Sequence, residues 1–379
     1  MKKKLFHLLV AFVLFVSTKT LQAQPGALDA NFGNGGFVLT GIGTVNNAIG
    51  FDVVVQPDGK TVVSGKATIV TGLTDAILIR YKINGELDSS FGTNGIVQES
   101  FTSYFDNFAA VSLQADGKLV VSGLSITPDS TFVLFARYNS NGTLDTAFRN
   151  RNNALKYYGF GNVAIGTIIQ PDNKILLMVN NNEPVTFNAQ TQIERYNENG
   201  TVDNSFAHNG NYTYTGEWYS KFTQDTKGRI VCLAGTGVTK LLRLKLNGNP
   251  DNSFGLGGFT SVQLSPYDGP ANVITQPDNK IVVCGNYQAA NFYDELFTVC
   301  RFNKNGSLDS SFNGTGVNSR KITGQDFAYD MVIHPSGKII AAGFTYAGAS
   351  TYIALITYNA NNGHIDSTWG VNGLDTVNT

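Results

Sequence analysis

The chain has 379 residues, of which 15% are charged, against about 25% in a typical soluble protein. Its 27 basic and 28 acidic residues nearly balance. Beyond the first four residues no basic run is present to neutralise a phosphate backbone, so we expect no nucleic-acid partner. The 41 glycines favour turns and sheet over helix, and three cysteines are too few to hold together a disulfide-stapled mini-fold.

The N-terminus has the layout of a secretory signal peptide. Met1–Lys4 is basic, Leu5–Val16 is apolar apart from one histidine, and Ala23 is a small residue placed for cleavage. An apolar run of twelve residues is shorter than the roughly 20 that a membrane-spanning helix needs, which disfavours the alternative of a membrane anchor. We therefore predict that residues 1–23 are a signal peptide. The mature chain, without a membrane span, would be periplasmic, on the cell surface or secreted.

Two short phrases repeat along the rest of the chain. The first begins as Leu28-Asp29-Ala-Asn-Phe32-Gly33, and its aspartate recurs as Asp29, Asp88, Asp145, Asp203, Asp251, Asp309 and Asp366. The second reads Gln56-Pro-Asp-Gly-Lys60 in its first copy and falls once in each of the six intervals, with a degenerate fourth copy at Gln224–Arg229. Five intervals span 57 to 59 residues; the fourth spans 48 and is shortened between Leu233 and Lys240. This regularity indicates a repeat architecture.

Each period has the pattern of four antiparallel strands, which we call a to d in chain order. In the second period, Ala109–Leu113 and Leu119–Gly123 are apolar and flank an Asp-Gly turn. Such a turn is a strong hairpin signal because these residues tolerate positive φ. Thr131–Tyr138 supplies strand c, and a short strand of the type Gly95–Val97 follows the next Asn-Gly turn as strand d.

A four-stranded sheet of this size cannot bury both of its faces alone, and packing several sheets around one axis solves this. We therefore predict an all-β fold, a six-bladed β-propeller of four-stranded antiparallel blades. It would form a single domain over residues 24–379, in six repeats of about 57 residues. A linear solenoid is the alternative, but no distinct capping repeat is evident.

The first phrase occurs seven times and the second six times. Because a d strand follows each first phrase, the chain has one d strand more than six blades need. We expect the segment Gly36–Thr40 to complete the last blade beside Tyr352–Tyr358 and so to close the ring, which would leave His364–Thr379 as a tail. The reverse assignment, in which the C-terminal stretch completes the last blade, stays open.

These phrases resemble the delta-60 repeat, a β-propeller repeat of exported bacterial proteins. Its pattern is visible in Arg80-Tyr81, Asn84-Gly85, Leu87-Asp88 and Phe91-Gly92, together with the Gln-Pro-Asp-Gly-Lys phrase. The resemblance covers about residues 26–379 and implies a propeller with no agreed activity. The chain departs from the pattern at four places, which are Arg149 and Ala207 for glycine, Trp369 for phenylalanine and Thr357 for arginine.

The repeated residues are best explained as framework. We expect the phenylalanine of each first phrase to be wedged between blades and the aspartate to accept backbone N–H groups in its own turn. One carboxylate per phrase is too few for Ca²⁺, which needs six to eight oxygens. Cys232, Cys284 and Cys300 are expected to be buried; a Cys284–Cys300 disulfide across one hairpin stays open. Only four histidines occur and no catalytic motif is present, so we expect no catalytic residue.

One set of polar residues suggests a site. Strand a is innermost in a propeller, so oxygens at its start would ring one mouth of the central channel. Eight residues before the first residue of the second phrase lie Asp106, Asn162, Asp268 and Asp326, and Asn47 and Glu217 are one position off. Such a ring can hold a cation such as Ca²⁺ or hydrogen-bond a sugar. The alternative is that the repeats share a turn-capping residue there. The metal therefore stays unknown, and we expect no other cofactor.

The d–a and b–c loops vary between repeats and lie on that same face, which we call the variable-loop face. Its aromatic residues are Tyr104, Phe105, Tyr157, Tyr158, Trp218, Tyr219, Tyr267, Phe292, Tyr293 and Tyr346. Aromatic rings beside amides and carboxylates suit a carbohydrate or peptide ligand, although many of these rings fit the core between blades equally well. We expect an exported scaffold that binds a protein or carbohydrate through this face, with Tyr104 and Trp218 in the site. The alternative function is a metal-dependent, lactonase- or lyase-like propeller enzyme with its site at the channel mouth.

Overall fold

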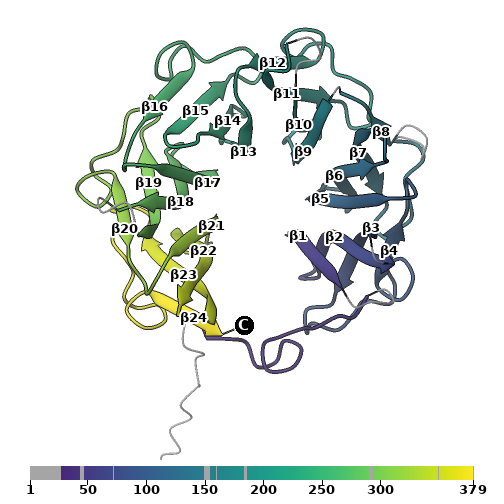
Figure 1. Cartoon of the computed structure of the whole chain (residues 1–379), viewed down its shortest axis with the longest axis horizontal. Helices are drawn as coiled ribbons and strands as arrows, with labels where there is room; N and C mark the ends of the chain where they lie inside the picture. The colour runs from purple at the N-terminus through teal and green to yellow at the C-terminus, as the bar shows by residue number, and fades with distance from the viewer. Residues whose placement is uncertain are drawn as a thin grey trace, which may run out of the picture.

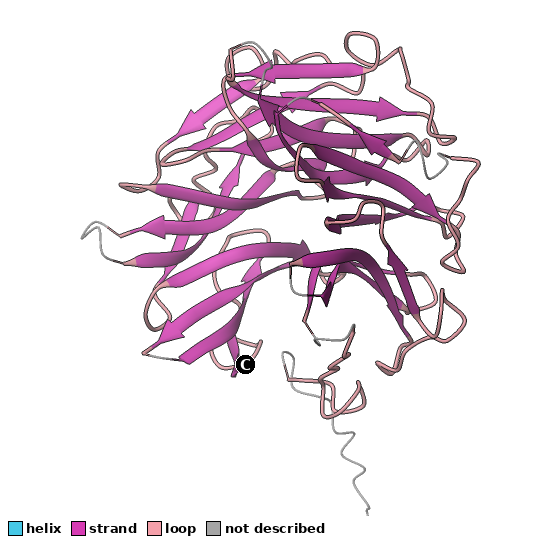
Figure 2. Ribbon diagram, turned by 45° about the vertical axis from the view of Figure 1, so that its right-hand side comes forward, coloured by secondary structure: helices cyan, strands magenta, loops and turns pink. Residues whose placement is uncertain are grey.

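The computed structural model describes residues 27–42, 47–70, 72–148, 154–158, 160–182, 186–289, 294–348 and 350–378. The predicted signal peptide lies outside these ranges. The described residues form strands joined by turns and loops, with no helix among them (Figure 2). No helix in this part of the chain is long and apolar enough to cross a membrane.

The strands form six four-stranded blades arranged around a central axis (Figure 1). Blades 1 to 3 consist of β1 (Ala48–Val55), β2 (Thr61–Val70), β3 (Leu73–Tyr81) and β4 (Ile96–Glu99); β5 (Phe105–Leu113), β6 (Leu119–Ile126), β7 (Thr131–Tyr138) and β8 (Leu155–Lys156); and β9 (Phe160–Ile169), β10 (Ile175–Asn182), β11 (Ala189–Tyr196) and β12 (Asn211–Thr215). Blades 4 to 6 consist of β13 (Tyr219–Gln224), β14 (Ile230–Ala234), β15 (Thr239–Leu244) and β16 (Phe259–Val262); β17 (Asp268–Thr275), β18 (Ile281–Gln288), β19 (Glu295–Phe302) and β20 (Val317–Arg320); and β21 (Asp326–Ile333), β22 (Lys338–Ala347), β23 (Ser350–Asn359) and β24 (Leu374–Asn378). The predicted six-bladed, all-β fold is confirmed.

Within each blade the strands pair antiparallel in chain order, with strand a nearest the axis (Figure 1). One parallel contact, between Thr74 of β3 and Phe105 of β5, links blades 1 and 2 into a continuous sheet. The shortened fourth interval falls in the loop between β14 and β15, as predicted, and both strands keep their pairing.

The second phrase forms the tight turn between strands a and b. Gln56 N–H donates to the Lys60 carbonyl at 2.8 Å, and Gly59 adopts a φ of +80° that favours glycine. In blade 4 the equivalent bond runs from Asp225 N–H to the Arg229 carbonyl at 2.9 Å. The degenerate copy therefore begins at Asp225 and not at Gln224. Repeat positions in β13, the strand before this turn, shift by one residue as a result.

The core lies between blades. Val62 and Leu78 of blade 1 form one buried cluster with Phe108 and Val111 of blade 2, and Phe91 of the first phrase is fully buried in the same cluster. The predicted phenylalanine wedge is confirmed by the burial of Phe91, Phe148, Phe206, Phe254 and Phe312, whereas Phe32 is half-buried. Blades that follow one another in the chain cover each other's apolar faces, which explains why one repeat could not be stable alone.

The last blade is completed by β24, which pairs with β23 so that Asn378 lies opposite Tyr352. The expectation that Gly36–Thr40 would take this place is wrong, and the open alternative is correct. β24 follows β23 after a short connection, whereas Gly36–Thr40 comes from the other end of the chain. Pairing β24 with β23 therefore closes a much shorter loop and costs less entropy. Residues 27–42 lie instead against blade 1, where Gly33 N–H donates to the Asn84 carbonyl at 2.8 Å.

Candidate functional site

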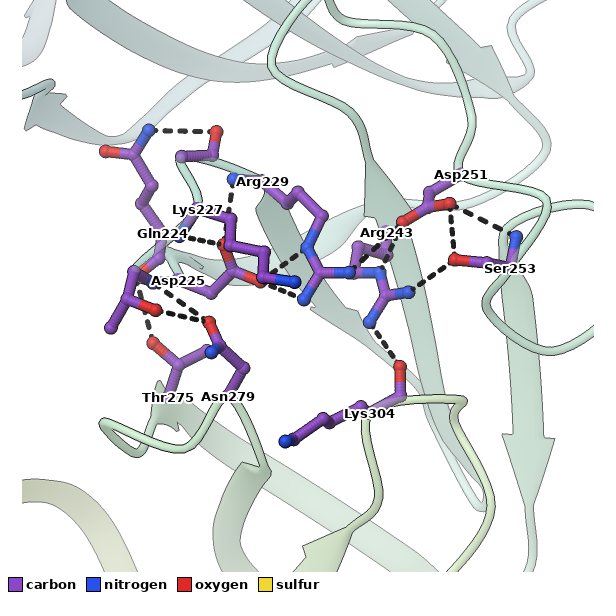
Figure 3. A network of polar contacts seen from close by, with 12 residues as sticks. Gln224, Asp225, Lys227, Arg229, Arg243, Asp251, Ser253, Thr275, Asn279 and Lys304 are labelled. Carbon is purple, nitrogen blue, oxygen red and sulfur yellow. Dashed lines mark hydrogen bonds and ion pairs between the residues drawn. The ribbon is translucent and has the colours of Figure 1, made fainter.

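An arginine network recurs at the blade junctions, and Figure 3 shows it in blade 4. Arg243 donates from Nε to Asp251 at 2.9 Å and from Nη2 to the Ser253 hydroxyl at 3.1 Å. Its Nη1 donates to the backbone carbonyl of Lys304, which belongs to the c–d turn of blade 5. Arg229 also pairs with Asp251, at 3.6 Å. The arginine therefore joins its own blade to the next one.

The same arginine occurs in five blades, as Arg80, Arg137, Arg195, Arg243 and Arg301, and each guanidinium lies over the phenylalanine of its own first phrase. In blade 1 the hydrogen bond from the Ser90 hydroxyl lowers the pKa of Asp88 well below its usual range, with further help from Lys60 and Arg80 and against the effect of burial. The phrase aspartates are thus engaged by protein donors. The recurrence of arginine in the sequence was the signal for this network, but its link to the next blade was not predicted.

The three aspartates predicted at the channel mouth are fully buried at the start of strand a. Asp106 accepts N–H bonds from Phe101 at 2.8 Å and Thr102 at 2.9 Å, both in the loop that leads into β5. Asp268 accepts in the same way from Leu264 and Ser265, and Asp326 accepts from Ile322 and Thr323. Each carboxylate therefore fastens its own d–a loop, as the turn-capping alternative describes.

The other three predicted residues have different surroundings. Asn162 is buried, and its amide donates to the Thr131 carbonyl at 2.5 Å. Glu217, which the corrected register places at the same position as Asp106, pairs with Lys240 at 2.7 Å. Asn47 is exposed, and its carbonyl accepts from Thr68 N–H at 2.8 Å. Asn47 and Glu217 thus bond within their own blades, whereas Asn162 bonds to strand c of the preceding blade. No group of three histidine, cysteine or acidic residues that could hold a metal occurs in the described ranges.

Seven aromatic side chains stand exposed in or beside the variable loops. Trp218 is 43% exposed and donates from Nε1 to the Asn181 carbonyl at 3.0 Å, and Tyr104 is 42% exposed. The exposed set is Tyr104, Phe105, Tyr157, Phe187, Trp218, Tyr267 and Tyr346. Tyr219 is buried and Tyr158 is half-buried, and Phe292 and Tyr293 lie outside the described residues. Phe187 was missed by the sequence analysis, although its place in a b–c loop was a sufficient signal.

Two pockets lie beside these loops. One, of about 380 Å³, is lined by Tyr214 and Phe259 together with the Glu217–Lys240 ion pair. The other, of about 260 Å³, is formed by the b–c loop 126–131 of blade 2 with Tyr157. The first pocket has several aromatic rings and the second has one, and both add hydroxyl or charged groups. This is the chemistry of a site for a polar ligand with an apolar face.

A buried carboxylate in blade 3 was not predicted. Glu194 accepts from Lys156 Nζ at 2.6 Å and from the Tyr158 hydroxyl at 2.7 Å, and the Tyr196 hydroxyl also donates to it. Burial raises the pKa of Tyr158 well above its usual value. Glu194 occupies the repeat position that Ala136 has in blade 2. This replacement of an alanine by a glutamate was the sequence signal for the carboxylate. Because its two oxygens already have three donors, this group serves the framework.

The three cysteines are buried and free. The open question of a Cys284–Cys300 disulfide is settled by strand register, because Cys284 lies opposite Val299 and Cys300 lies opposite Val283. A shift of one residue turns the two thiols to opposite faces of the sheet. Burial raises the pKa of Cys300 to about 12, so this thiol is also unreactive.

One family model, which describes a β-propeller, matches parts of the chain. The β-propeller domain of unknown function DUF5122 matches the chain at residues 56–91, 114–148 and 276–312. No curated protein matches the chain. Similar solved structures include a protein of unknown function from Bacteroides caccae, with 11% identity over 79% of this chain and 94% of that one and a TM-score of 0.43. A protein from Lactobacillus plantarum has 11% identity over 86% and 88% of the two chains and a TM-score of 0.49. The chain thus carries the DUF5122 β-propeller domain, the delta-60 repeat, at three positions.

Proposed function

We propose that this protein is an exported, non-catalytic scaffold that binds a glycan or a polypeptide on its variable-loop face. The observation that carries the proposal is the contrast between two groups of side chains on that face. The buried aspartates at the start of strand a are bonded to their own loops, whereas seven aromatic rings of the loops stand exposed.

Exposed aromatic rings are costly to leave in water and strong anchors for a ligand. A tyrosine or tryptophan buries a large area on binding while its polar edge keeps a hydrogen-bond partner, and such residues dominate binding energy at interfaces. Trp218 fits this description, because its ring is partly exposed while its Nε1 is already bonded to Asn181. The polar pockets beside Tyr157 and Glu217 supply hydrogen-bonding groups next to the rings.

The competing function is a metal-dependent enzyme at the channel mouth. It would need the carboxylates of Asp106, Asp268 and Asp326 to be directed at a common ion. Each instead accepts two backbone N–H bonds of its own loop, so a metal would have to displace these bonds. This observation favours the scaffold.

Binding to an array of glycans and proteins tests the proposal. The wild-type protein should bind a subset of them, and Trp218→Ala and Tyr104→Ala should each weaken that binding. Ile83→Ala is the matched control, because Ile83 is 70% exposed in the c–d turn of blade 1, on the opposite face. The proposal would be overturned by the absence of any ligand, or by equal losses in the loop-face and control variants.

Export is tested separately. The layout of residues 1–23 supports cleavage after Ala23. Cell fractionation and N-terminal sequencing of the mature protein should find it outside the cytoplasm, beginning at Gln24. A cytoplasmic protein with an intact N-terminus would contradict this part of the proposal.

A further inference from the structure

Five of the junctions between successive blades are sealed in the same way. The inner strand of each blade packs on the blade before it, β5 on blade 1 and β21 on blade 5 being the first and last cases. The arginine of one blade reaches the c–d turn of the next, as Arg301 reaches the carbonyl of Ala360. At the first junction Asp52 also accepts from Val111 N–H of blade 2 at 2.9 Å.

The sixth interval, between blade 6 and blade 1, lacks these features. Thr357 replaces the arginine, and its buried Oγ1 has no hydrogen-bond partner among the described residues. Asp330, at the position of Asp52, bonds to Asn272 and Met331 within blades 5 and 6. Over the same described ranges, β1 makes no contact with blade 6 as extensive as those that seal the other junctions. Figure 1 shows this interval at the bottom of the ring, wider than the others.

Apolar side chains are exposed on both walls of the interval. Val53 and Val55 are 55% and 66% exposed, although their counterparts Val111 and Leu113 in blade 2 pack against blade 1. On the opposite wall, Val332 is 57% exposed, although its counterpart Ile274 packs into the next junction. Both walls thus have the side chains of a blade junction without the neighbour that would cover them.

The N-terminal segment occupies the outermost strand position of a further blade. Its Gly33 N–H bonds to the c–d turn of blade 1, as Gly92 N–H bonds to that of blade 2, each at 2.8 Å. A Cβ on Gly85 would meet Val38, as one on Gly142 would meet Val97. Val38 is therefore placed like Val97 in strand d of blade 1. Among the described residues, however, no strand c pairs with the stretch 37–40.

We propose that the interval is a seventh blade position and that it is completed by three antiparallel β-strands from another polypeptide. Residues 27–42 already provide strand d and its turn, so the missing element is strands a to c. An occupant of this kind would pair its third strand with residues 37–40 through the backbone. Its two apolar faces would cover Val53 and Val55 on one side and Val332 on the other. A second copy of this chain has its own strands committed to six blades, which makes a different polypeptide the better donor.

Thiol labelling of Val55→Cys tests whether the position is open in the free protein. The natural cysteines are buried, so the new thiol would be the one that reacts. Leu113→Cys is the matched control, because it has the same place in a junction that is filled. The monomeric protein should be labelled at least about tenfold faster at position 55 than at position 113. Equal, slow labelling would show that blade 6 closes on blade 1, and protection only in a dimer would assign the position to a second copy. Either result would overturn the proposal.

A chimera tests what fills the position. Residues 105–143, which contain strands a to c of blade 2 and the following turn, are fused directly before Leu28, the counterpart of Leu144. This insert should slow the labelling of Val55→Cys at least about tenfold and raise the melting temperature. The same insert with Val120→Lys and Phe135→Lys is the control and should protect poorly. The peptide 105–143 added in trans to the unfused protein provides a second measurement. Unchanged labelling with both the chimera and the peptide would overturn the proposal.

Discussion

Arg195 of β11 donates a hydrogen bond across a blade junction to the backbone carbonyl of Leu246, at 2.6 Å. The same guanidinium binds Asp203 at 2.7 Å and lies over the ring of Phe206 at 4.7 Å. One side chain thus orders its own first phrase and holds the turn of the next blade. Because the arrangement recurs in five blades, the ring is held by repeated polar bonds as well as by apolar packing.

Replacement of this arginine should therefore be strongly destabilising. Arg195→Ala removes the ion pair with the buried Asp203 and the bond to the Leu246 carbonyl in the next blade. We expect a loss of about 3–5 kcal/mol in the free energy of unfolding. Urea unfolding measures this loss. Lys82→Ala is the control, since the exposed Lys82–Glu86 pair should contribute at most about 1 kcal/mol. A loss for Arg195→Ala no larger than that of the control would show that the cross-junction bond is not important.

Stability should decrease in acid. The folded pKa of Asp88 lies below its ordinary value, so its contribution is complete above about pH 4 and is lost as pH falls through the folded pKa. The urea midpoint of the wild-type protein should therefore be lower at pH 3 than at pH 6. Ser90→Ala removes the largest cause of the lowered pKa. The variant should have a lower urea midpoint at pH 6 and a smaller difference between its midpoints at pH 3 and pH 6. An unchanged difference in this variant would contradict the assignment.

The buried aspartates at the channel mouth should act as structural caps. Asp268→Ala leaves the N–H groups of Leu264 and Ser265 without their acceptor, which we expect to cost about 3 kcal/mol of unfolding free energy. Asp129→Ala, in an exposed loop, should be nearly neutral. Thermal unfolding with Ca²⁺ and with EDTA completes the experiment. The melting temperature of the wild-type protein should be the same in both, and an increase with Ca²⁺ would instead support a metal site.

The thiols should stay reduced and unreactive even after export. Cys284 and Cys300 point to opposite faces of their blade, and burial raises the pKa of both thiols above its usual value. Alkylation of the denatured, unreduced protein followed by mass spectrometry should find three modified cysteines. The native protein should not react with a thiol reagent at pH 8. One modified cysteine in the denatured sample would show that a disulfide is present.

The repeats made most of the fold predictable from the sequence. Phrase spacing gave the number of blades, and the Asp-Gly and Asp-Asn turns located the a–b hairpins, because positive φ at residues such as Gly59 and Asn173 leaves few alternatives. The closing strand was assigned wrongly. The choice between Gly36–Thr40 and β24 depends on which strand pairs with β23, and both segments follow the same phrase.

The candidate site was harder to predict. The sequence indicated that Asp106, Asp268 and Asp326 share one position in the fold, but it contained no information on the direction of their oxygens. That direction is set by backbone N–H groups of the d–a loops, whose sequences differ between repeats. Exposure of Trp218 and burial of its neighbour Tyr219 likewise follow from strand register, which the degenerate turn of blade 4 concealed.

The most direct test of the proposed function is the affinity of an array-identified ligand for matched variants. Our account predicts that Trp218→Ala weakens binding at least about tenfold, as expected for a central aromatic anchor, while Ile83→Ala on the opposite face leaves it unchanged. Full affinity in every aromatic variant of the variable loops, or a loss confined to Ile83→Ala, would contradict it.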